Sequence, residues 1–590
     1  MTRDKRSMSD NTPSSSQDST PTPPAAQAPR RGPLIAIGVV AAALVAGGLA
    51  LAFGLIPAFH SAPVDTLEAP ESPEVVRDLK RPDALIESAS LSQLPKAVLE
   101  VPLLRDVLTE DFVFYYENNA DRLGLTGTLR RIVYEHELTL KDSVIEELLD
   151  QPAQVALWRG ADGRLRDFMV VLKRGGLAKV LEPLAKVAAD DTQLKKVSEI
   201  QVKGAATPVY SLRYGAEKTL LFVSRGDQML VLSNPKMLFP NPDYDNLGEP
   251  DAAVAKDLGS ALEGEPLFAK DFALEPRGEL KQRITLSAGV LAMGYQRLIP
   301  TFAGVRFEQG KDGWHSYLAL NEVARQPDLD FTPVWQAMPM GASACVALPV
   351  TPGLYDNMLV KLGAEQKMAA AFSEHLSGAA GLCWYPESRL HSPLLAVKLD
   401  APASPELDDQ LGKLFGSMIG AYEANVEAGA FEVESRAEGD GRLWQRQVSS
   451  RFGQYPASAA ENPDQVSGNG FFRVSLLRDG NTLLFSIDDK LLDKARNTLA
   501  KRYPPLADVL PKDALVPAYL APKTLSELLK RETLDSLPQD LEPVFRNAAD
   551  TLLLPRLKTL AGNGSYALTL PAGSEPSGEW EWLPLDWKAL

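Results

Sequence analysis

The sequence has little cysteine and histidine, the residues that much metal and redox chemistry requires. Among 590 residues only Cys345 and Cys383 are cysteines, and five are histidines. The motifs H-E-x-x-H, G-x-x-x-x-G-K-[ST], G-x-G-x-x-G and G-x-S-x-G are absent as well. These absences argue against the common zinc proteases, P-loop NTPases, dinucleotide-binding enzymes and α/β-hydrolases. We therefore expect no catalytic residue, metal or cofactor, although a catalytic site assembled from residues far apart in the chain stays open.

The chain also lacks an excess of basic residues. It has 61 Lys and Arg against 77 Asp and Glu, and its formal net charge is −16. An acidic protein repels the phosphate backbone of nucleic acids. Nucleic acid is therefore not an expected partner.

Charged residues are missing altogether from residues 32–59, which read GPLIAIGVVAAALVAGGLALAFGLIPAF. A helix crosses the hydrocarbon core with about 20 apolar residues. Arg30 and Arg31 come directly before this stretch, and acidic residues follow it from Asp65 onward. Because basic residues stay on the cytoplasmic side, the pattern predicts a single membrane-spanning helix with a cytoplasmic N-terminus. The alternative is a cleaved signal peptide, whose apolar core is shorter, about 7–15 residues.

Small residues recur at every fourth position within this stretch. They are Gly38, Ala42, Ala46, Ala50 and Gly54. Such spacing lets two membrane helices approach closely, which predicts self-association through this helix. The alternative is chance, since the stretch is rich in alanine and glycine.

The segments on either side of the apolar stretch are poor in large apolar residues. Residues 1–31 are rich in Ser, Pro, Thr and Gln and are expected to form a disordered cytoplasmic tail. Residues 60–80 are rich in proline and acidic residues, which is typical of an extended stalk. The folded body is expected from residue 81 to the C-terminus.

The body contains one plan twice. Val155–Trp158 (VALW) and Met169–Lys173 (MVVLK) correspond to Gly381–Trp384 (GLCW) and Leu394–Lys398 (LLAVK). Each pair flanks a turn and predicts a β-hairpin. A helical pattern of leucines then follows, as in Leu407–Met418. We expect an α+β fold of two tandem copies, each an antiparallel sheet with helices on one face. The predicted domains are 81–325, with an insertion near 110–150, and 333–590.

Two short motifs in SRGDQMLVLSNPKML (224–238) resemble functional signals. Arg225-Gly226-Asp227 is an RGD tripeptide, and Ser233-Asn234-Pro235-Lys236 fits S-x-x-K. The second copy has RDGNTLLFSIDDKLL (478–492) at the corresponding place, where the S-x-x-K spacing is lost. Gly-Asp and Asp-Gly are turn formers. We therefore interpret the segment as a hairpin turn, a strand and a helix start.

Two groups of residues are candidates for interaction or crosslinking. Phe112, Phe114, Tyr115 and Tyr116 lie in the insertion, where they could form a partner-binding surface or part of the core. Cys345 and Cys383 each lie in a predicted strand. Outside the cytoplasm they could form a disulfide; the alternative is two buried thiols.

Three runs together resemble a known family. They are LLRDVLTEDFVFYYENNADRLGL, EELLDQPAQVALWR and RGGLAKVLEPLAK. The chain is similar, from about Glu74 to its end, to domain of unknown function 2138, a family of membrane-anchored proteins of Gram-negative bacteria. The predicted topology and the composition indicate the bacterial inner membrane with the body in the periplasm, and the resemblance to this family agrees with that location. The resemblance also implies a partner, because members are often encoded beside α2-macroglobulin-like envelope proteins. It carries over no activity and no functional residue.

The sequence thus favours a non-catalytic, single-pass envelope protein that presents a large body for protein–protein interaction. Two other classes stay open. One is a periplasmic hydrolase acting on peptide or cell wall, which would need a cleft holding ionisable groups with perturbed pKa values. The other is a carrier of a lipid or small ligand, which would need a deep apolar cavity.

Overall fold

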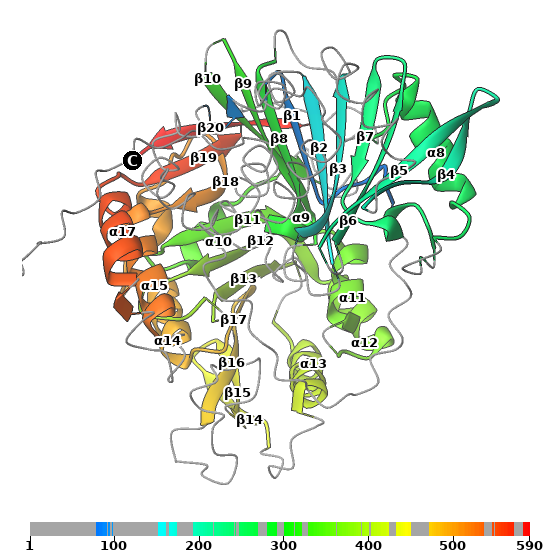
Figure 1. Cartoon of the computed structure of the whole chain (residues 1–590). Helices are drawn as coiled ribbons and strands as arrows, with labels where there is room; N and C mark the ends of the chain where they lie inside the picture. The colour runs from blue at the N-terminus through cyan, green and yellow to red at the C-terminus, as the bar shows by residue number, and fades with distance from the viewer. Residues whose placement is uncertain are drawn as a thin grey trace, which may run out of the picture.

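A computed structural model shows how the body of the chain folds (Figure 1). It describes residues 78–90, 93–94, 97, 152–160, 165–173, 193–215, 218–240, 242, 247–268, 280–291, 300–311, 313–320, 329–361, 363–390, 392–400, 403–423, 432–449, 471–535, 546–547, 549–570 and 582–590. The predicted tail, apolar stretch and insertion, with its aromatic residues, lie outside these ranges, as does the predicted stalk up to residue 77. None of the helices in the described ranges combines the length and apolar composition needed to cross a bilayer.

Twenty strands make up the β-structure of the described residues. Those before residue 325 are β1 Ala84–Ser88, β2 Ala153–Arg159, β3 Leu165–Lys173, β4 Leu194–Val202, β5 Ala205–Gly215, β6 Lys218–Arg225, β7 Gln228–Leu232, β8 Gln282–Ser287, β9 Phe302–Gly310 and β10 Gly313–Leu320. Those after it are β11 Ala344–Pro349, β12 Leu376–Trp384, β13 Leu394–Leu399, β14 Glu434–Glu438, β15 Gly441–Ser449, β16 Phe471–Asp479, β17 Thr482–Ser486, β18 Leu515–Leu520, β19 Tyr566–Leu570 and β20 Leu583–Ala589.

These strands form one continuous antiparallel sheet. Its pairings give the order β4-β5-β6-β7-β3-β2-β1-β8-β9-β10 and then β20-β19-β18-β11-β12-β13-β17-β16-β15-β14. The two halves can be compared by counting strands outward from the β10–β20 pair. At every step the strand of the second half has a number ten higher than its counterpart in the first half, as in β9 and β19 or β1 and β11. The order is therefore palindromic, and the two halves meet where β10 pairs with β20.

The expected fold class is wrong in its central point, because the halves do not form two tandem sheets. Ser316, Tyr317 and Leu318 of β10 pair with Leu585, Pro584 and Leu583 of β20. An edge strand exposes unpaired backbone N–H and C=O groups. Here the edge strands of the two halves, β10 and β20, pair with each other and so provide partners for these groups. The alternating pattern in the sequence indicates strands, but it does not indicate that β10 pairs with β20, which lies at the far end of the chain.

The expected arrangement of helices on one face is also wrong. The α-helices of the described residues are α8 Ala252–Leu262, α9 Ala288–Leu291, α10 Thr332–Ala337, α11 Pro352–Lys361, α12 Gln366–Ser373, α13 Pro405–Glu423, α14 Asp489–Leu499, α15 Pro522–Asp535 and α17 Leu554–Leu560. In the second half α10 and α14 share one core with Cys383 and Leu394, while α11, α12 and α13 share another with Leu376 and Val397. Successive strand residues point to opposite faces, so helices cover both faces (Figure 1).

Close packing of α10 on the sheet depends on a glycine. A Cβ atom at Gly381 of β12 would lie 2.3 Å from Cγ1 of Val334 on α10. Cβ atoms do not approach so closely, and α10 could not keep this position over a larger residue. The helix and strand therefore meet where the strand has no side chain.

The local predictions for the hairpins are confirmed. β2 pairs with β3, and β12 pairs with β13, both antiparallel. The leucine-rich stretch after the second hairpin lies in α13. Hairpins depend on residues close in sequence, which is why alternation and turn residues suffice to predict them.

Candidate functional site

Cys345 and Cys383 are joined by a disulfide between β11 and β12. The two residues lie directly opposite each other in the register, with Cα atoms 4.2 Å apart. Both are buried in the core that also contains Tyr385 and Trp335. The bond therefore crosslinks neighbouring strands inside the sheet, where it is shielded from solvent.

The RGD and S-x-x-K residues lie in the hairpin β6–β7 and at its end. Arg225 donates to the carbonyl oxygen of Val202 at 2.6 Å, and Gly226 occupies the turn with φ of 58°. The Ser233 hydroxyl accepts from the Phe168 N–H at 2.8 Å, and Lys236 is exposed. Arg225 thus reaches across β5 to the end of β4, and Ser233 joins the end of β7 to the neighbouring strand β3, as expected for a structural segment.

The second copy uses the same place in a similar way. Arg478, the counterpart of Arg225, pairs through two N–H groups with the Asp408 carboxylate at 2.6 and 2.9 Å. The Ser486 hydroxyl accepts from the Asp488 N–H, and the Asp488 side chain caps α14. These contacts fix a turn and a helix start, and they leave both serines in structural roles.

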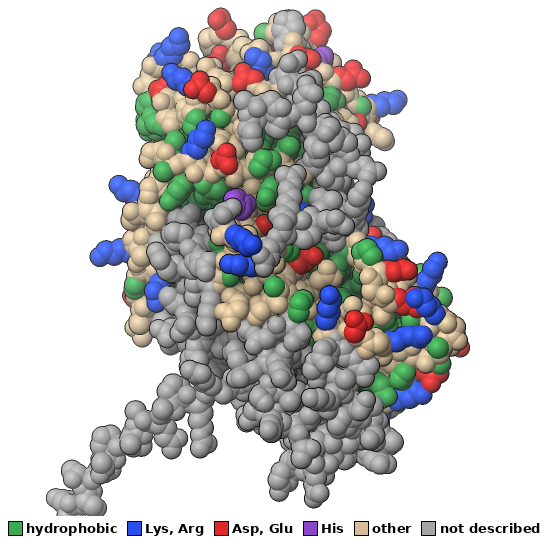
Figure 2. Space-filling model, turned by 90° about the horizontal axis from the view of Figure 1, so that it is seen from above, with side chains coloured by type: hydrophobic (Ala, Val, Ile, Leu, Met, Phe, Trp, Pro, Cys, Tyr) green, Lys and Arg blue, Asp and Glu red, His purple; other side chains and the backbone are tan. Residues whose placement is uncertain are grey.

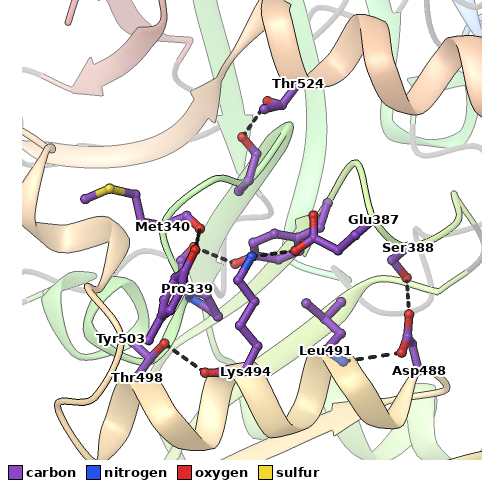
Figure 3. A network of polar contacts seen from close by, with 12 residues as sticks. Pro339, Met340, Glu387, Ser388, Asp488, Leu491, Lys494, Thr498, Tyr503 and Thr524 are labelled. Atoms are coloured by element: carbon purple, nitrogen blue, oxygen red, sulfur yellow. Dashed lines mark hydrogen bonds and ion pairs between the residues drawn. The ribbon is translucent and has the colours of Figure 1, made fainter.

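A network around Lys494 of α14 has the appearance of a site (Figure 3). The Lys494 ammonium pairs with Glu387 and lies 5.2 Å and 5.0 Å from the ring centres of Tyr385 and Tyr503. The buried Tyr385 hydroxyl donates to the Pro339 carbonyl oxygen at 2.9 Å, and burial raises its pKa well above the ordinary value. A phenol in that state keeps its proton at neutral pH. The network therefore fastens α14 to the segments that precede β11 and follow β12.

A row of charged side chains crosses the first half. Glu87 of β1, Arg283 of β8 and Glu308 of β9 lie directly opposite one another. The Arg283 side chain is 1% exposed, and it contacts Glu87 at 2.6 Å and Glu308 at 2.9 Å. Each glutamate thus has a cation beside it. Because a shift by one residue would turn these side chains to the opposite face, the row favours a single strand register.

Arg306 of β9 extends this row toward the second half. Its guanidinium lies 4.2 Å from the ring centre of Trp582, a residue from the C-terminal end of the chain. Burial, and then the neighbouring charge of Arg283, lowers the pKa of Arg306 to about 10. It still carries its charge at neutral pH, so the contact with Trp582 is a cation–π interaction. The arginine row and the β10–β20 pairing thus join the same two parts of the chain.

An open groove lies at the end of the sheet, between edge strand β4 and helix α8. It has a volume of about 620 Å³, which is in the usual range of ligand sites. One wall is formed by Ser198–Val202 of β4 and by Lys203 in the turn that follows. The other is formed by one face of α8, at the spacing of helical turns: Ala252, Ala255, Lys256, Gly259, Ser260 and Glu263.

The two walls converge at one end of the groove. A Cβ atom at Gly259 would lie 3.4 Å from the Gln201 carbonyl oxygen, so helix and strand almost touch there. Just beyond, the Lys203 ammonium pairs with Glu263 at 3.0 Å. The groove therefore runs from this closed end toward Ser198 and Ala252.

The β4–β5 turn determines which backbone groups of β4 face the groove. Lys203 and Gly204 both have positive φ, 47° and 71°, in a two-residue turn flanked by Val202 and Ala205. In such a hairpin the flanking residues form a hydrogen-bonded pair, and the pairs alternate along the strands. Gln201 and Glu199 therefore direct their N–H and C=O groups away from β5, toward the groove. Neither this turn nor the helix beside it was predicted from the sequence.

Charged side chains of both signs are interspersed over the described part of the surface shown in Figure 2. The groove has the same mixed character, with Glu199, Lys203, Lys256 and Glu263 on its walls. A phosphate polymer is recognised by a basic surface. A partner that uses hydrogen bonds and small apolar contacts fits this groove better.

Comparison with known proteins places the chain in a family. The family model described as "Uncharacterized protein conserved in bacteria (DUF2138)" matches residues 33–587. The chain is 48% identical over 522 residues to "Uncharacterized protein YfaA" of Escherichia coli (strain K12), an alignment covering 87% of this chain and 91% of that protein. No solved structure matches. The chain belongs to the uncharacterised bacterial family DUF2138.

Proposed function

We propose that this protein is a single-pass, membrane-anchored envelope protein whose body binds another protein. The observation that carries the binding role is the β4–α8 groove, where a sheet edge with outward-facing backbone groups lies open beside a helix. Sheet edges of this kind bind other polypeptides. The α2-macroglobulin-like class, which the sequence resemblance implies, supplies the first partner to test.

The anchored location has two supports. One is the charge-free stretch 32–59 directly after Arg30 and Arg31. The other is the buried disulfide between Cys345 and Cys383, because disulfides persist in oxidising compartments such as the bacterial periplasm. Both agree with a cytoplasmic N-terminus and a periplasmic body in the inner membrane. The small-residue spacing from Gly38 to Gly54 adds self-association of the membrane helix to the proposal.

Fusions at the C-terminus test this topology. Alkaline phosphatase becomes active only in an oxidising compartment, and we expect a full-length fusion to be active and to remain with membranes after carbonate extraction. The matched control deletes residues 32–59, and it should lose both properties. An active fusion that is released as a soluble, shortened protein would instead identify a cleaved signal peptide.

A partner-binding role is tested by crosslinking in intact cells. We expect the wild-type chain to crosslink to one envelope protein, and an α2-macroglobulin-like protein is the first candidate. The amount of this protein recovered with the chain should exceed the amount recovered with an unrelated membrane-anchored control. Recovery of no envelope protein above that control would contradict the interaction role.

A further inference from the structure

We propose that the β4–α8 groove binds an extended peptide segment of another protein, which adds to the sheet as a strand beside β4. This proposal rests on the proposed interaction function and names the chemistry of the partner. The groove has the two parts that strand addition requires: a row of β4 edge groups that no other described strand pairs with, and a helix wall for the side chains of the incoming segment.

The backbone groups point to an antiparallel strand. Glu199 presents both its N–H and its C=O to the open end of the groove, so one residue of an antiparallel partner can exchange two hydrogen bonds with it. Gln201 adds a further N–H, while its carbonyl oxygen lies against Gly259. The convergence of the walls there limits the incoming strand at this end. A short segment therefore fits, and it enters from the side of Ser198.

The helix wall indicates which side chains this segment carries. Ala252, Ala255 and Ser260 present small side chains to the groove, and Gly259 has none. Ile200 and Val202, which also line the groove, are almost fully buried. This leaves room for a partner side chain that points toward α8, and the alanine methyl groups favour an aliphatic or aromatic one. The exposed Lys256 and Glu249 lie at the rim, where charges contribute more to selectivity than to affinity.

A second copy of this chain is a poorer occupant than an isolated strand. Pairing of β4 with β4 of another copy would bring a second α8 to the same side of the sheet. Both helices would then occupy the space that forms the groove. A segment without its own flanking helix meets no such obstacle.

The test uses the full-length chain in detergent micelles and a displayed library of random 12-residue peptides. Selected peptides are synthesised, and their affinities are measured by fluorescence polarisation. Glu199→Pro removes the N–H that faces the groove, and proline is tolerated at a strand position whose N–H is not part of the ladder. Glu199→Ala keeps that N–H and loses only the exposed ion pair with Lys196, so it is the matched control.

A second pair of variants tests the helix wall. Ala252→Trp fills the groove from the first turn of α8, and Ala253→Trp places the same exposed bulk on a position that does not line it. We expect Glu199→Pro to weaken peptide binding roughly tenfold, since it removes a hydrogen bond and blocks pairing. Ala252→Trp should abolish binding. Ala253→Trp should stay within about twofold, because exposed substitutions contribute little. Glu199→Ala, whose side chain lies on the groove wall, should weaken binding less than Glu199→Pro because it keeps the N–H.

Hydrogen exchange supplies an independent readout. Bound peptide should slow exchange in the segment that contains the Glu199 and Gln201 amides and leave the β14 edge unchanged. Selected peptides that bind Glu199→Pro and Ala252→Trp as well as the wild type would overturn the proposal, as would sedimentation showing a dimer that these two variants dissociate. If the two groove variants still crosslink to an envelope partner in cells, the interaction function stands and only its assignment to this groove is lost.

Discussion

The pairing of β10 with β20 predicts that the two halves are energetically coupled. Leu318 of β10 and Leu583 of β20 are directly opposite each other and are 5% and 7% exposed. They belong to a core that also contains Phe302 from the first half and Leu570 from the second. Replacing either leucine by alanine should therefore destabilise both halves.

The magnitude follows from the burial of these side chains. A buried Leu→Ala substitution costs about 2–5 kcal/mol through lost transfer free energy and the cavity that remains. Direct cross-strand pairs contribute about 0.2–1 kcal/mol beyond their separate burial. The double variant Leu318→Ala/Leu583→Ala should then be less destabilised than the sum of the singles by about that coupling energy. Leu258→Ala in α8, far along the sheet, should be additive with Leu583→Ala.

Denaturant unfolding of the full-length chain, followed by tryptophan fluorescence, gives the free energies for this cycle. Hydrogen exchange then shows which strands are destabilised. Leu583→Ala should speed amide exchange in β9 and β10 as well as in β19. A coupling energy of zero, together with faster exchange confined to the second half, would refute the continuous sheet. In that case the halves would be independent domains that only touch.

Other substitutions give separate predictions. Among the described residues the buried hydroxyl of Tyr355 has no hydrogen-bond partner, while that of Tyr385 donates to a carbonyl oxygen at 2.9 Å; Tyr355→Phe should be neutral or stabilising and Tyr385→Phe should cost about 1 kcal/mol in denaturant melts. Burial raises the pKa of both phenols above the ordinary value of 10. The unfolded chain therefore loses protons above pH 10 that the native state keeps, so stability should fall as pH rises above 10, less steeply in Tyr355→Phe. The double variant Cys345→Ala/Cys383→Ala opens a loop of 38 residues and should lose about 4 kcal/mol in the same melts; an equal loss in reductant-treated wild type would support this, and unchanged stability would contradict it.

Several local features could be predicted from the sequence because they depend on nearby residues. The hairpins around Trp158 and Trp384 follow from alternation on both sides of a turn, and the Gly226 turn follows from the need for positive φ. The interpretation of the RGD and S-x-x-K motifs as structural depended on the same kind of local comparison between the two copies.

The candidate groove was not predictable from the same information. Its β4 wall is an ordinary alternating strand, and its α8 wall is an ordinary helix with Asp251 as N-cap. Nothing in either segment says that they converge at Gly259 or that β4 ends the described sheet. The aromatic residues at 112–116, which the sequence offered for partner binding, lie outside the described residues and stay a prediction.

The sequence by itself determined the two hairpins, the Gly226 turn and the helix after the second hairpin, since alternation, φ requirements and helical periodicity act over a few residues. It also determined the charge-free stretch before the body. Only the tertiary structure decided that the edges of the two halves pair, that helices cover both faces, and that Arg306 meets Trp582. Backbone N–H and C=O groups are the same in every strand, so the identity of a strand's partner is fixed by the packing of whole faces and not by the strand's own residues.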